Sequence, residues 1–387
     1  MSLPPQLLDD VRRHLARTPG ELTAHRVAEA LRASGVAVTD AAVLAAHDQL
    51  RRELHGAGPL DALVNLPGVT DVLVNGCDSV WIDRGRGLEQ VHAVSFPDDD
   101  AVRRLAQRLA ASGGRRVDDA TPHVDVRLPD GTRLHAVLAP TARPGTLVSL
   151  RVPARSHFSL SDLVAAGAVP TAGAELLREV VSARLAFLVT GGTGSGKTTV
   201  LAVLLGLVAA DERIVLVEDA SELRPDHPHV VGLEARAPNV EGVGGITLRT
   251  LVRQALRMRP DRLVVGEVRG AEVVELLAAL NTGHAGGCGT LHANSAGDVP
   301  ARIEALALAA GLPRAAVHSQ VASALDVVVH LGRDRTGRRS VREVAVPVRD
   351  EAGLVRMVPA VRFAEGAAVP GSGFDQLRAR LDSGLRG

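Results

Sequence analysis

The spacing of hydrophobic residues divides the chain into parts with different periods. In the first 57 residues, apolar side chains recur at helical spacing, as at Leu7, Val11 and Leu15. Asp40 stands where a side chain would cap a further helix, through the stretch AAVLAAHDQLRREL. We therefore expect residues 1–57 to form a helical packing segment that carries no chemistry of its own.

The period changes at Gly58 to the alternation that is typical of strands. The stretch VTDVLVNGCDSVWIDRGRGLEQVHAV contains an Asn-Gly turn at 75–76 and predicts a β-meander. A helix is predicted over DDDAVRRLAQRLAAS, and a Pro-Asp-Gly turn at 129–131 predicts a second hairpin. With a last strand in TLVSLRVP, residues 58–153 are predicted to form a small α+β domain.

The rest of the pattern indicates a connector followed by an α/β domain. Residues 154–183 are predicted to be helical, with Gly and Pro punctuation that suits a hinge. From 184 to 348, short buried-type strands alternate with helices, which predicts a parallel-rich sheet covered on both faces. The stretch ALDVVVHLGRDRTGRRSVREVAVPV predicts a hairpin with an arginine-rich turn. Residues 349–387 are expected to form a loose C-terminal tail.

Composition narrows the class of protein. A chain of 387 residues with 46% hydrophobic and 23% charged residues is globular. A net charge of zero and 2% aromatic residues give no support for nucleic-acid binding. Two cysteines suit a reducing compartment, and the N-terminus lacks the apolar core of a signal peptide. The longest apolar stretch, 200–210, is shorter than the roughly 20 residues that span a bilayer. We expect a cytoplasmic protein without a transmembrane segment.

The stretch GGTGSGKTT matches a phosphate-binding loop. Gly191, four further residues and Gly196 precede Lys197 and Thr198, between an apolar strand and an apolar helix, as the motif requires. Backbone N–H groups would hold phosphates, Lys197 would reach the β- and γ-phosphates, and Thr198 would bind Mg²⁺. Lys197 is the only lysine among 44 Lys and Arg residues, which indicates that a guanidinium does not fit there. The other residues assigned to nucleotide binding are Thr193, Gly194, Ser195 and Thr199.

Acidic residues follow two of the predicted strands. Glu218 and Asp219 come after RIVLV, at a strand end where ligands of open α/β sheets bind. Both are candidates for holding Mg²⁺ through water or for orienting the attacking water, and Glu218 is the one assigned to the metal, partly through water. A solvated strand end is the alternative. Glu267 follows the next such strand and is the candidate to polarise water in line with the γ-phosphate. Many enzymes of this kind carry Asp where this chain has Gly266, which argues against direct magnesium binding by that strand.

The stretch NTGHAGGCGTLHANS supplies two more candidates, His284 and His292. Their imidazoles and the hydroxyl of Thr290 are suited to hydrogen-bond phosphate oxygens or to communicate between subunits. Two alternatives stay open. One is a metal site of His284, Cys288 and His292, which lacks the usual fourth ligand; the other is a polar loop with core histidines.

Taken together, GGTGSGKTT, VEDASELR, LRMRPDRLVVGEVRG and NTGHAGGCGTLHANS resemble the ordered motifs of the type II/type IV secretion ATPase superfamily. The resemblance is closest to the tight-adherence pilus branch and covers roughly Gly58 to Val348. It implies an α/β fold: a RecA-like P-loop NTPase domain after a smaller, PAS-like α+β domain and a helical N-terminal segment. The chain has too few cysteines for the four-cysteine metal insert of some pilus and type II motors.

The resemblance also implies an activity. Members of the superfamily form ring-shaped homohexamers at the cytoplasmic face of an inner membrane, and hydrolyse ATP with Mg²⁺. Their partners are inner-membrane platform proteins of a pilus or secretion system. By motif, Glu267 is the catalytic glutamate, Glu218 lies in the aspartate box, and His284 and His292 lie in the histidine box.

The resemblance further assigns arginines. Arg133 in DGTRLH and Arg151 in VSLRVP match residues of the first domain that close over the phosphates. ATP binding would draw the two domains together, and hydrolysis would release them about the 154–183 hinge. The remaining motif arginines, which act within one subunit or between subunits, are Arg257, Arg259 and Arg269.

Three other hypotheses compete with a pilus motor. A RecA-like helicase or DNA translocase would need a basic path or stacking aromatics. A type IV secretion or conjugation ATPase belongs to the same superfamily. A scaffold with a decayed site is disfavoured, because the chain retains Lys197, Thr198, Glu218, Glu267 and His292.

Overall fold

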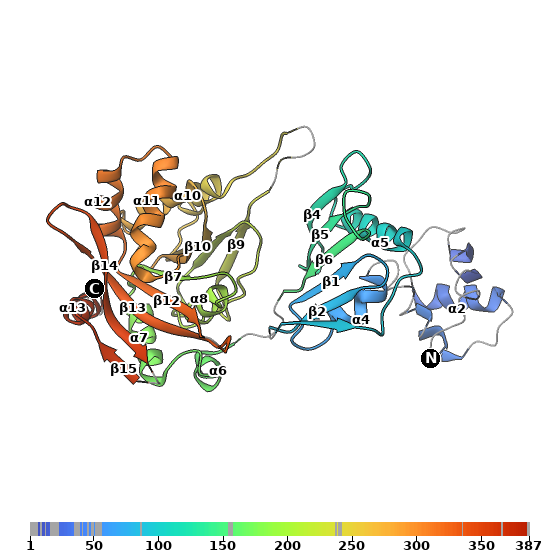
Figure 1. The fold of residues 1–387 in the computed structure, drawn as a ribbon, viewed down its shortest axis with the longest axis horizontal. Helices are drawn as coiled ribbons and strands as arrows, with labels where there is room; N and C mark the ends of the chain where they lie inside the picture. Colours follow the sequence, from blue (N-terminus) through green and yellow to red (C-terminus); the bar gives the residue numbers. More distant parts are fainter. Residues whose placement is uncertain are drawn as a thin grey trace. The chain divides into compact units, whose positions relative to one another are not determined.

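In the computed structural model, the strands form two sheets, one in each of two units, Met1–Ala154 and Arg155–Gly387 (Figure 1). The structure describes residues 56–384 apart from 86, 154–157, 237, 239–241, 335 and 365–366. Before residue 56 it describes residues 7, 10–11, 13–15, 23–34, 39–40, 42–44, 46–47 and 50. Each unit is described by itself.

The first unit contains a six-stranded antiparallel sheet in the order β3-β2-β1-β6-β5-β4. Successive strands β1, β2 and β3 pair as the predicted meander, and the turn at 129–131 joins β4 to β5 as predicted. Helix α5 buries one apolar face in the same core as the sheet. The elements are η1 (Gly58–Leu60), α4 (Asp61–Val64), β1 (Asp71–Asn75), β2 (Val80–Asp83), β3 (Leu88–Val91), α5 (Asp99–Ser112), β4 (His123–Arg127), β5 (Arg133–Val137) and β6 (Leu147–Arg151).

The N-terminal residues that the structure describes are mostly helical. Helix α2 (Ala24–Ala33) buries Val27 and Leu31 in a small core that also contains Val11 and Leu50. The cap predicted at Asp40 is wrong by one residue, because the hydroxyl of Thr39 accepts the hydrogen bond from the backbone N–H of Ala42.

The second unit contains a nine-stranded sheet in the order β15-β14-β13-β12-β7-β11-β10-β8-β9. The six strands from β12 to β9 in this order are parallel, and β12 to β15 pair antiparallel. The strands are β7 (Phe187–Gly191), β8 (Ile214–Glu218), β9 (Val230–Glu234), β10 (Arg262–Val268), β11 (Cys288–His292), β12 (Val327–Arg333), β13 (Arg339–Arg349), β14 (Val355–Ala364) and β15 (Ala367–Pro370).

Helices cover both faces of this sheet, as the strand pattern predicts. Phe187 and Val189 of β7 point into one core with α6, α7, α8 and α13, whereas Leu188 points into a second core with α9 to α12. The helices are α6 (Leu160–Ala165), α7 (Thr171–Ser182), α8 (Lys197–Leu205), α9 (Leu248–Ala255), α10 (Glu272–Leu280), η2 (Ala296–Asp298), α11 (Val299–Ala309), α12 (Arg314–Ala324) and α13 (Phe374–Gly384). Among the helices described, none is long and apolar enough to cross a membrane.

The helices predicted over 154–183 are confirmed in the described part, 158–183, as α6 and α7. Leu163 and Leu177 lie in the core with the sheet, and a hinge role for this stretch stays a prediction. The expectation of a loose C-terminal tail is wrong. The expected loose tail instead adds β14 and β15 to the sheet, and α13 packs Leu377 and Leu381 with no exposure. An edge strand and an 11-residue helix carry weak local signals, because most of their stability comes from the β13 edge and the core that they cover. The hairpin with the arginine-rich turn is confirmed as β12 and β13.

Candidate active site

The strand order brings four chain segments to one edge of the second sheet. Parallel strands β7, β11, β10 and β8 are neighbours in this order, so their carboxyl ends lie at the same edge. Gly191 ends β7 and lies opposite His292, which ends β11. Glu267 is near the end of β10, and Glu218 ends β8. Residues separated by up to 101 positions in the sequence therefore surround one small region.

The loop between β7 and α8 has the backbone conformation that its glycines allow. Gly194 and Gly196 have φ of 66° and 95°, which side-chain-bearing residues rarely adopt. A Cβ at Gly191 would lie 2.6 Å from both the Leu331 carbonyl oxygen and Ser195 Oγ. Gly196 is the N-cap residue of α8 and offers no side chain to cap it, so the first N–H groups of the helix have no side-chain partner at this end. We call this loop, residues 191–196, together with the first N–H groups of α8, the cradle.

The ammonium of Lys197 lies against the backbone carbonyl groups of this cradle. Its ammonium donates hydrogen bonds to the carbonyl oxygens of Gly191 and Gly192, at 3.1 and 3.0 Å. The side chain is buried, and burial lowers the pKa of Lys197, while the negative charge of Glu267 opposes that shift. The ammonium is thus held by two carbonyl groups, which a polyanionic ligand can replace.

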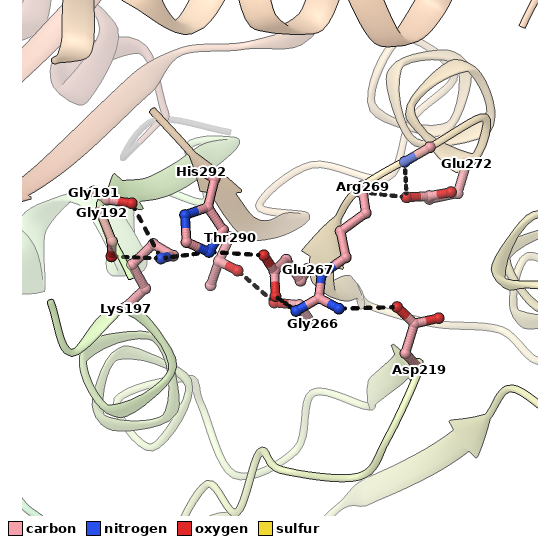
Figure 2. Close-up of polar contacts among 11 residues, drawn as sticks. Gly191, Gly192, Lys197, Asp219, Gly266, Glu267, Arg269, Glu272, Thr290 and His292 are labelled. Atoms are coloured by element: carbon pink, nitrogen blue, oxygen red, sulfur yellow. Dashed lines mark hydrogen bonds and ion pairs between the residues drawn. The ribbon is translucent and has the colours of Figure 1, made fainter. Parts of the chain in front are cut away.

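His292 lies between Lys197 and Glu267 (Figure 2). Its Nε2 is 3.3 Å from Lys197 Nζ and 3.1 Å from Glu267 Oε1. Burial, and then the charge of Lys197, lower the pKa of His292, so the ring is neutral near pH 7. A neutral ring nitrogen cannot both accept from the lysine and donate to the carboxylate, so the two neighbours compete for it.

Glu267 keeps one carboxylate oxygen available. Oε2 accepts a hydrogen bond from Arg269 Nη2 at 2.5 Å, and Arg269 also lies 4.0 Å from Asp219. Oε1 is buried and lies 3.1 Å from His292 Nε2, but it makes no hydrogen bond with any of the described residues. A buried carboxylate oxygen with no donor is costly unless it serves a ligand or water.

The turn after β10 is fixed by Glu272, which sequence reasoning missed. Its Oε1 accepts hydrogen bonds from the backbone N–H groups of Arg269 and Gly270, at 2.6 and 2.7 Å (Figure 2). Thr290 on β11 donates to the Gly266 carbonyl at 2.7 Å and so ties β11 to β10 next to Glu267. An acidic residue in the first turn of a predicted helix was the available signal for Glu272.

Glu218 lies at the same edge in a more buried environment. Its Oε1 accepts backbone hydrogen bonds from Glu222 and Leu223, at 3.0 and 2.9 Å. Burial nevertheless raises the pKa of Glu218 to about 7. A Cβ at Gly266 would lie 2.7 Å from Glu218 Cγ, so this chain has glycine where an aspartate would collide with the glutamate.

The residues present fit a nucleoside triphosphate with magnesium. Ser195 Oγ in the loop is buried and without a hydrogen-bond partner among the described residues, like Glu267 Oε1. Positive charge and helix N–H groups line the cradle, and the carboxylates of Glu218 and Glu267 lie on neighbouring strands. Hydroxyl and carboxylate oxygens are the ligands that Mg²⁺ prefers. Thr198, in the first turn of α8, and Glu218 are the residues that would hold it.

Three predicted residues are not brought to the loop of their own chain. His284 precedes β11 at the opposite edge of the sheet and lies near the end of α10, with Nδ1 3.2 Å from the Ala279 carbonyl. Arg257 and Arg259 follow α9, just before the amino end of β10. A role for these three residues in a neighbouring subunit stays a prediction.

The alternative of a metal bound by His284, Cys288 and His292 does not fit the structure. Cys288 is fully buried in the apolar core at the amino end of β11, whereas His292 ends the strand. Burial raises the pKa of the Cys288 thiol to about 12, which disfavours the thiolate that binds metals. Within the described part of the chain, no group of three His, Cys, Asp or Glu residues is placed to hold a metal ion.

The two arginines predicted in the first unit are neighbours. Arg133 on β5 lies directly opposite Arg151 on β6, and Asp125 Oδ2 lies 3.3 Å from Arg133 Nη2. The adjacent pair Leu134 and Leu150 is buried, so the arginines belong to the other face of this sheet.

A glycine-rich loop between a parallel strand and a helix, with acidic residues at neighbouring strand ends, defines the class of P-loop nucleotide-binding α/β proteins. The chain belongs to the type II/IV secretion system protein family, which it matches over residues 53–358. It is 58% identical over 325 residues to "Putative conjugal transfer protein Rv3659c" of Mycobacterium tuberculosis, over 82% of this chain and 92% of that protein.

More distant similarities agree with this family. Identity to "Type IV secretion system protein PtlH" of Bordetella pertussis is 32% over 305 residues, covering 71% of this chain and 88% of that protein. The solved ATPase DotB of Legionella pneumophila has a TM-score of 0.52 at 19% identity, over 77% of this chain and 80% of that one. The fold is the RecA-like P-loop fold predicted from the motifs. These names support the superfamily and do not distinguish its tight-adherence branch.

Proposed function

We propose that the chain is an ATPase that powers transport of macromolecules through the bacterial envelope. The observation that carries this proposal is the contact series from Lys197 through His292 to Glu267 at the mouth of the phosphate loop (Figure 2). It joins a phosphate-binding cation to a carboxylate with an unused buried oxygen. Nucleotide binding alone would need only the first of these groups.

Each residue has a role in the proposed reaction. Lys197 binds the β- and γ-phosphates, and its hydrogen bonds to the loop carbonyls are exchanged for bonds to phosphate oxygens. Glu267 accepts a proton from the attacking water at Oε1, while Arg269 holds Oε2 and orients the carboxylate. When Lys197 turns to the phosphates, His292 Nε2 becomes free to hydrogen-bond Glu267 or the water.

Magnesium has a defined place in this scheme. When bound, Mg²⁺ neutralises part of the phosphate charge. Thr198 and Glu218 are the groups that would hold it, Glu218 partly through water.

The transport process is proposed from the relatives. Two relatives bear the names conjugal transfer protein and type IV secretion system protein, which favours a conjugation or secretion machine. Assembly of a tight-adherence pilus is a narrower version of the same proposal, supported by the motif resemblance. In either case we propose a homohexamer at the cytoplasmic face of the inner membrane, working through membrane platform proteins. Subunit contacts would explain why His284, Arg257 and Arg259 lie away from the loop of their own chain.

We also propose that the first unit takes part in hydrolysis. Arg133 and Arg151 are cross-strand neighbours on one face of this sheet, and guanidinium groups suit phosphate oxygens as hydrogen-bond acceptors. Arg151→Ala should slow ATP hydrolysis by roughly tenfold or more. Its second unit should unfold like the wild type, and a wild-type rate would show that this unit does not act on the nucleotide.

Phosphate release from ATP by the purified full chain tests the proposed function. We expect magnesium-dependent hydrolysis that is not stimulated by single-stranded DNA. The absence of hydrolysis in every assembly state, including the protein bound to membranes of the source cell, would contradict the ATPase proposal. Salt-sensitive DNA binding with DNA-stimulated hydrolysis would instead favour the helicase or translocase hypothesis.

A further inference from the structure

Strand β12 lies beside the strand that leads into the phosphate loop, and the proposed reaction uses none of the residues of β12. It pairs in parallel with β7, so that His330 lies opposite Thr190, one residue before the loop begins. His330 Nδ1 and Thr190 Oγ1 are 3.0 Å apart in a buried hydrogen bond. One residue further along β12, the Leu331 carbonyl closes the space beside Gly191.

The contact at the end of β12 reaches the loop itself. Arg333 donates two hydrogen bonds to the Gly194 carbonyl oxygen, from Nε at 3.1 Å and from Nη2 at 2.7 Å. A Cβ at Gly194 would lie 2.9 Å from Nη2, so the guanidinium lies close against the loop backbone. Exposed arginines are usually solvated, and two donors on a single loop carbonyl are a specific arrangement.

This contact constrains one peptide group of the phosphate loop. The Gly194 carbonyl and the Ser195 N–H belong to one planar trans peptide and point in opposite directions. Arg333 fixes the carbonyl end, and the Ser195 N–H points to the Gly192 carbonyl at 3.3 Å within the loop. The guanidinium therefore helps to fix the orientation of the Gly194–Ser195 peptide, whose N–H donates within the loop.

The residue after Arg333, Asp334, makes hydrogen bonds within the same hairpin. Asp334 Oδ1 accepts hydrogen bonds from the backbone N–H groups of Thr336 and Arg338, each at 2.9 Å, and from the Thr336 hydroxyl at 2.6 Å. These hydrogen bonds lower the pKa of Asp334, so its carboxylate is ionised and accepts them at neutral pH. Arg333 thus extends from a constrained turn.

We propose that Arg333 is a positioning residue for nucleotide binding, which holds the Gly194–Ser195 peptide so that the loop is preformed for phosphate. The inference rests on the proposed function, since it concerns the nucleotide site of the same ATPase. It differs from a role for charge alone, because two directed donors are needed. It also differs from a contact with the γ-phosphate, because a preformed loop serves ATP and ADP equally.

The test compares nucleotide affinity and turnover of the full chain for Arg333→Gln, Arg333→Lys and the control Arg338→Gln. Arg338 is exposed in the same hairpin and donates to the Gly167 carbonyl at 3.3 Å, away from the loop. We expect Arg333→Gln to raise KM for ATP and Kd for ADP together, by about five- to tenfold, with kcat within about twofold of the wild type. Arg333→Lys should recover little of this loss, and Arg338→Gln should behave as the wild type. Equal thermal midpoints would show that the variants fold.

Three results would overturn the inference. These are wild-type affinity in Arg333→Gln, full recovery in Arg333→Lys, and a loss for ATP without a loss for ADP. Each presupposes that the wild type binds nucleotide. A wild-type chain that binds neither ATP nor ADP would instead contradict the proposed function, so the two failures are distinguishable.

Discussion

Buried polar side chains at the two edges of the second sheet differ in how completely they are hydrogen-bonded. At the amino edge, buried Arg262 donates to both carboxylate oxygens of Glu212, at 2.7 and 3.2 Å, and to the Val181 carbonyl at 3.0 Å. At the carboxyl edge, Glu267 Oε1 and Ser195 Oγ are buried without hydrogen-bond partners among the described residues. Arg213 Nε at the amino edge also lacks a partner among the described residues, but the Arg262–Glu212 pair there is fully hydrogen-bonded, unlike Glu267 and Ser195 at the carboxyl edge.

The difference indicates what each edge does. A fully hydrogen-bonded buried ion pair ties neighbouring segments together and has no capacity left for a ligand. An edge with unused acceptors, positive-φ glycines and a lysine held by two carbonyls keeps binding capacity at a cost in stability. Substitutions at the carboxyl edge should therefore affect activity, and those at the amino edge should affect folding.

Glu267→Gln should have the largest effect on turnover. The amide keeps the size of the side chain and can still accept from Arg269, but it cannot take a proton from water. We expect kcat to fall by about 10²- to 10⁴-fold, with Kd for ATP within about threefold of the wild type. Single-turnover hydrolysis and equilibrium binding measure the two quantities. Unchanged hydrolysis would remove Glu267 from the role of base, and Glu351→Gln, in an exposed turn, is the control.

Arg262→Leu should separate stability from activity at the amino edge. Removing one partner of a buried ion pair leaves Glu212 poorly paired, so we expect a loss of about 3–5 kcal/mol in the free energy of unfolding. The fraction that stays folded should bind ATP as the wild type does. Denaturant unfolding measures the loss, and Arg378→Gln, which breaks the exposed pair with Glu179, should cost no more than about 1 kcal/mol. A stable Arg262→Leu protein with weak ATP binding would reverse the assignment of the edges.

Glu218 predicts a pH dependence of stability at the carboxyl edge. Its pKa rises from an ordinary 4.5 to about 7 on folding, so the folded state holds a proton that the unfolded state releases between these values. This contribution to stability is complete below pH 4.5 and is lost as pH rises through about 7, and it amounts to about 3 kcal/mol at most. Glu218→Gln should lack this slope when unfolding is followed from pH 4.5 to 8 with a chelator present. A slope equal to that of the wild type would contradict the burial argument.

Much of this arrangement could be predicted from local sequence. The phosphate loop, the alternation of strands and helices, and the acidic ends of β8 and β10 depend on short motifs and on hydrophobic periods. The motifs also placed His292 and Glu267 in one site, because parallel strands end at the same edge.

Other features depend on tertiary contacts that no local pattern encodes. Glu272 and Arg333 act through backbone groups of distant or turn residues, and Gly266 is explained only by the nearby Glu218 side chain. His284 lies eight positions before His292 in a single motif, yet the five-residue strand β11 separates them to opposite edges of the sheet. Burial of β14 and α13 likewise needs the sheet edge and core that they cover.

The central claim is that the carboxyl edge binds ATP through a cradle that requires the ammonium of Lys197. The most direct test is calorimetric binding of ATP with Mg²⁺ to the wild type, Lys197→Arg and Lys197→Ala. A guanidinium keeps the charge but cannot take the place of an ammonium between two loop carbonyls. We predict that both variants lose at least about tenfold in affinity while remaining folded. Wild-type affinity in Lys197→Arg would contradict the requirement for an ammonium, and wild-type affinity in Lys197→Ala would contradict ATP binding at this edge.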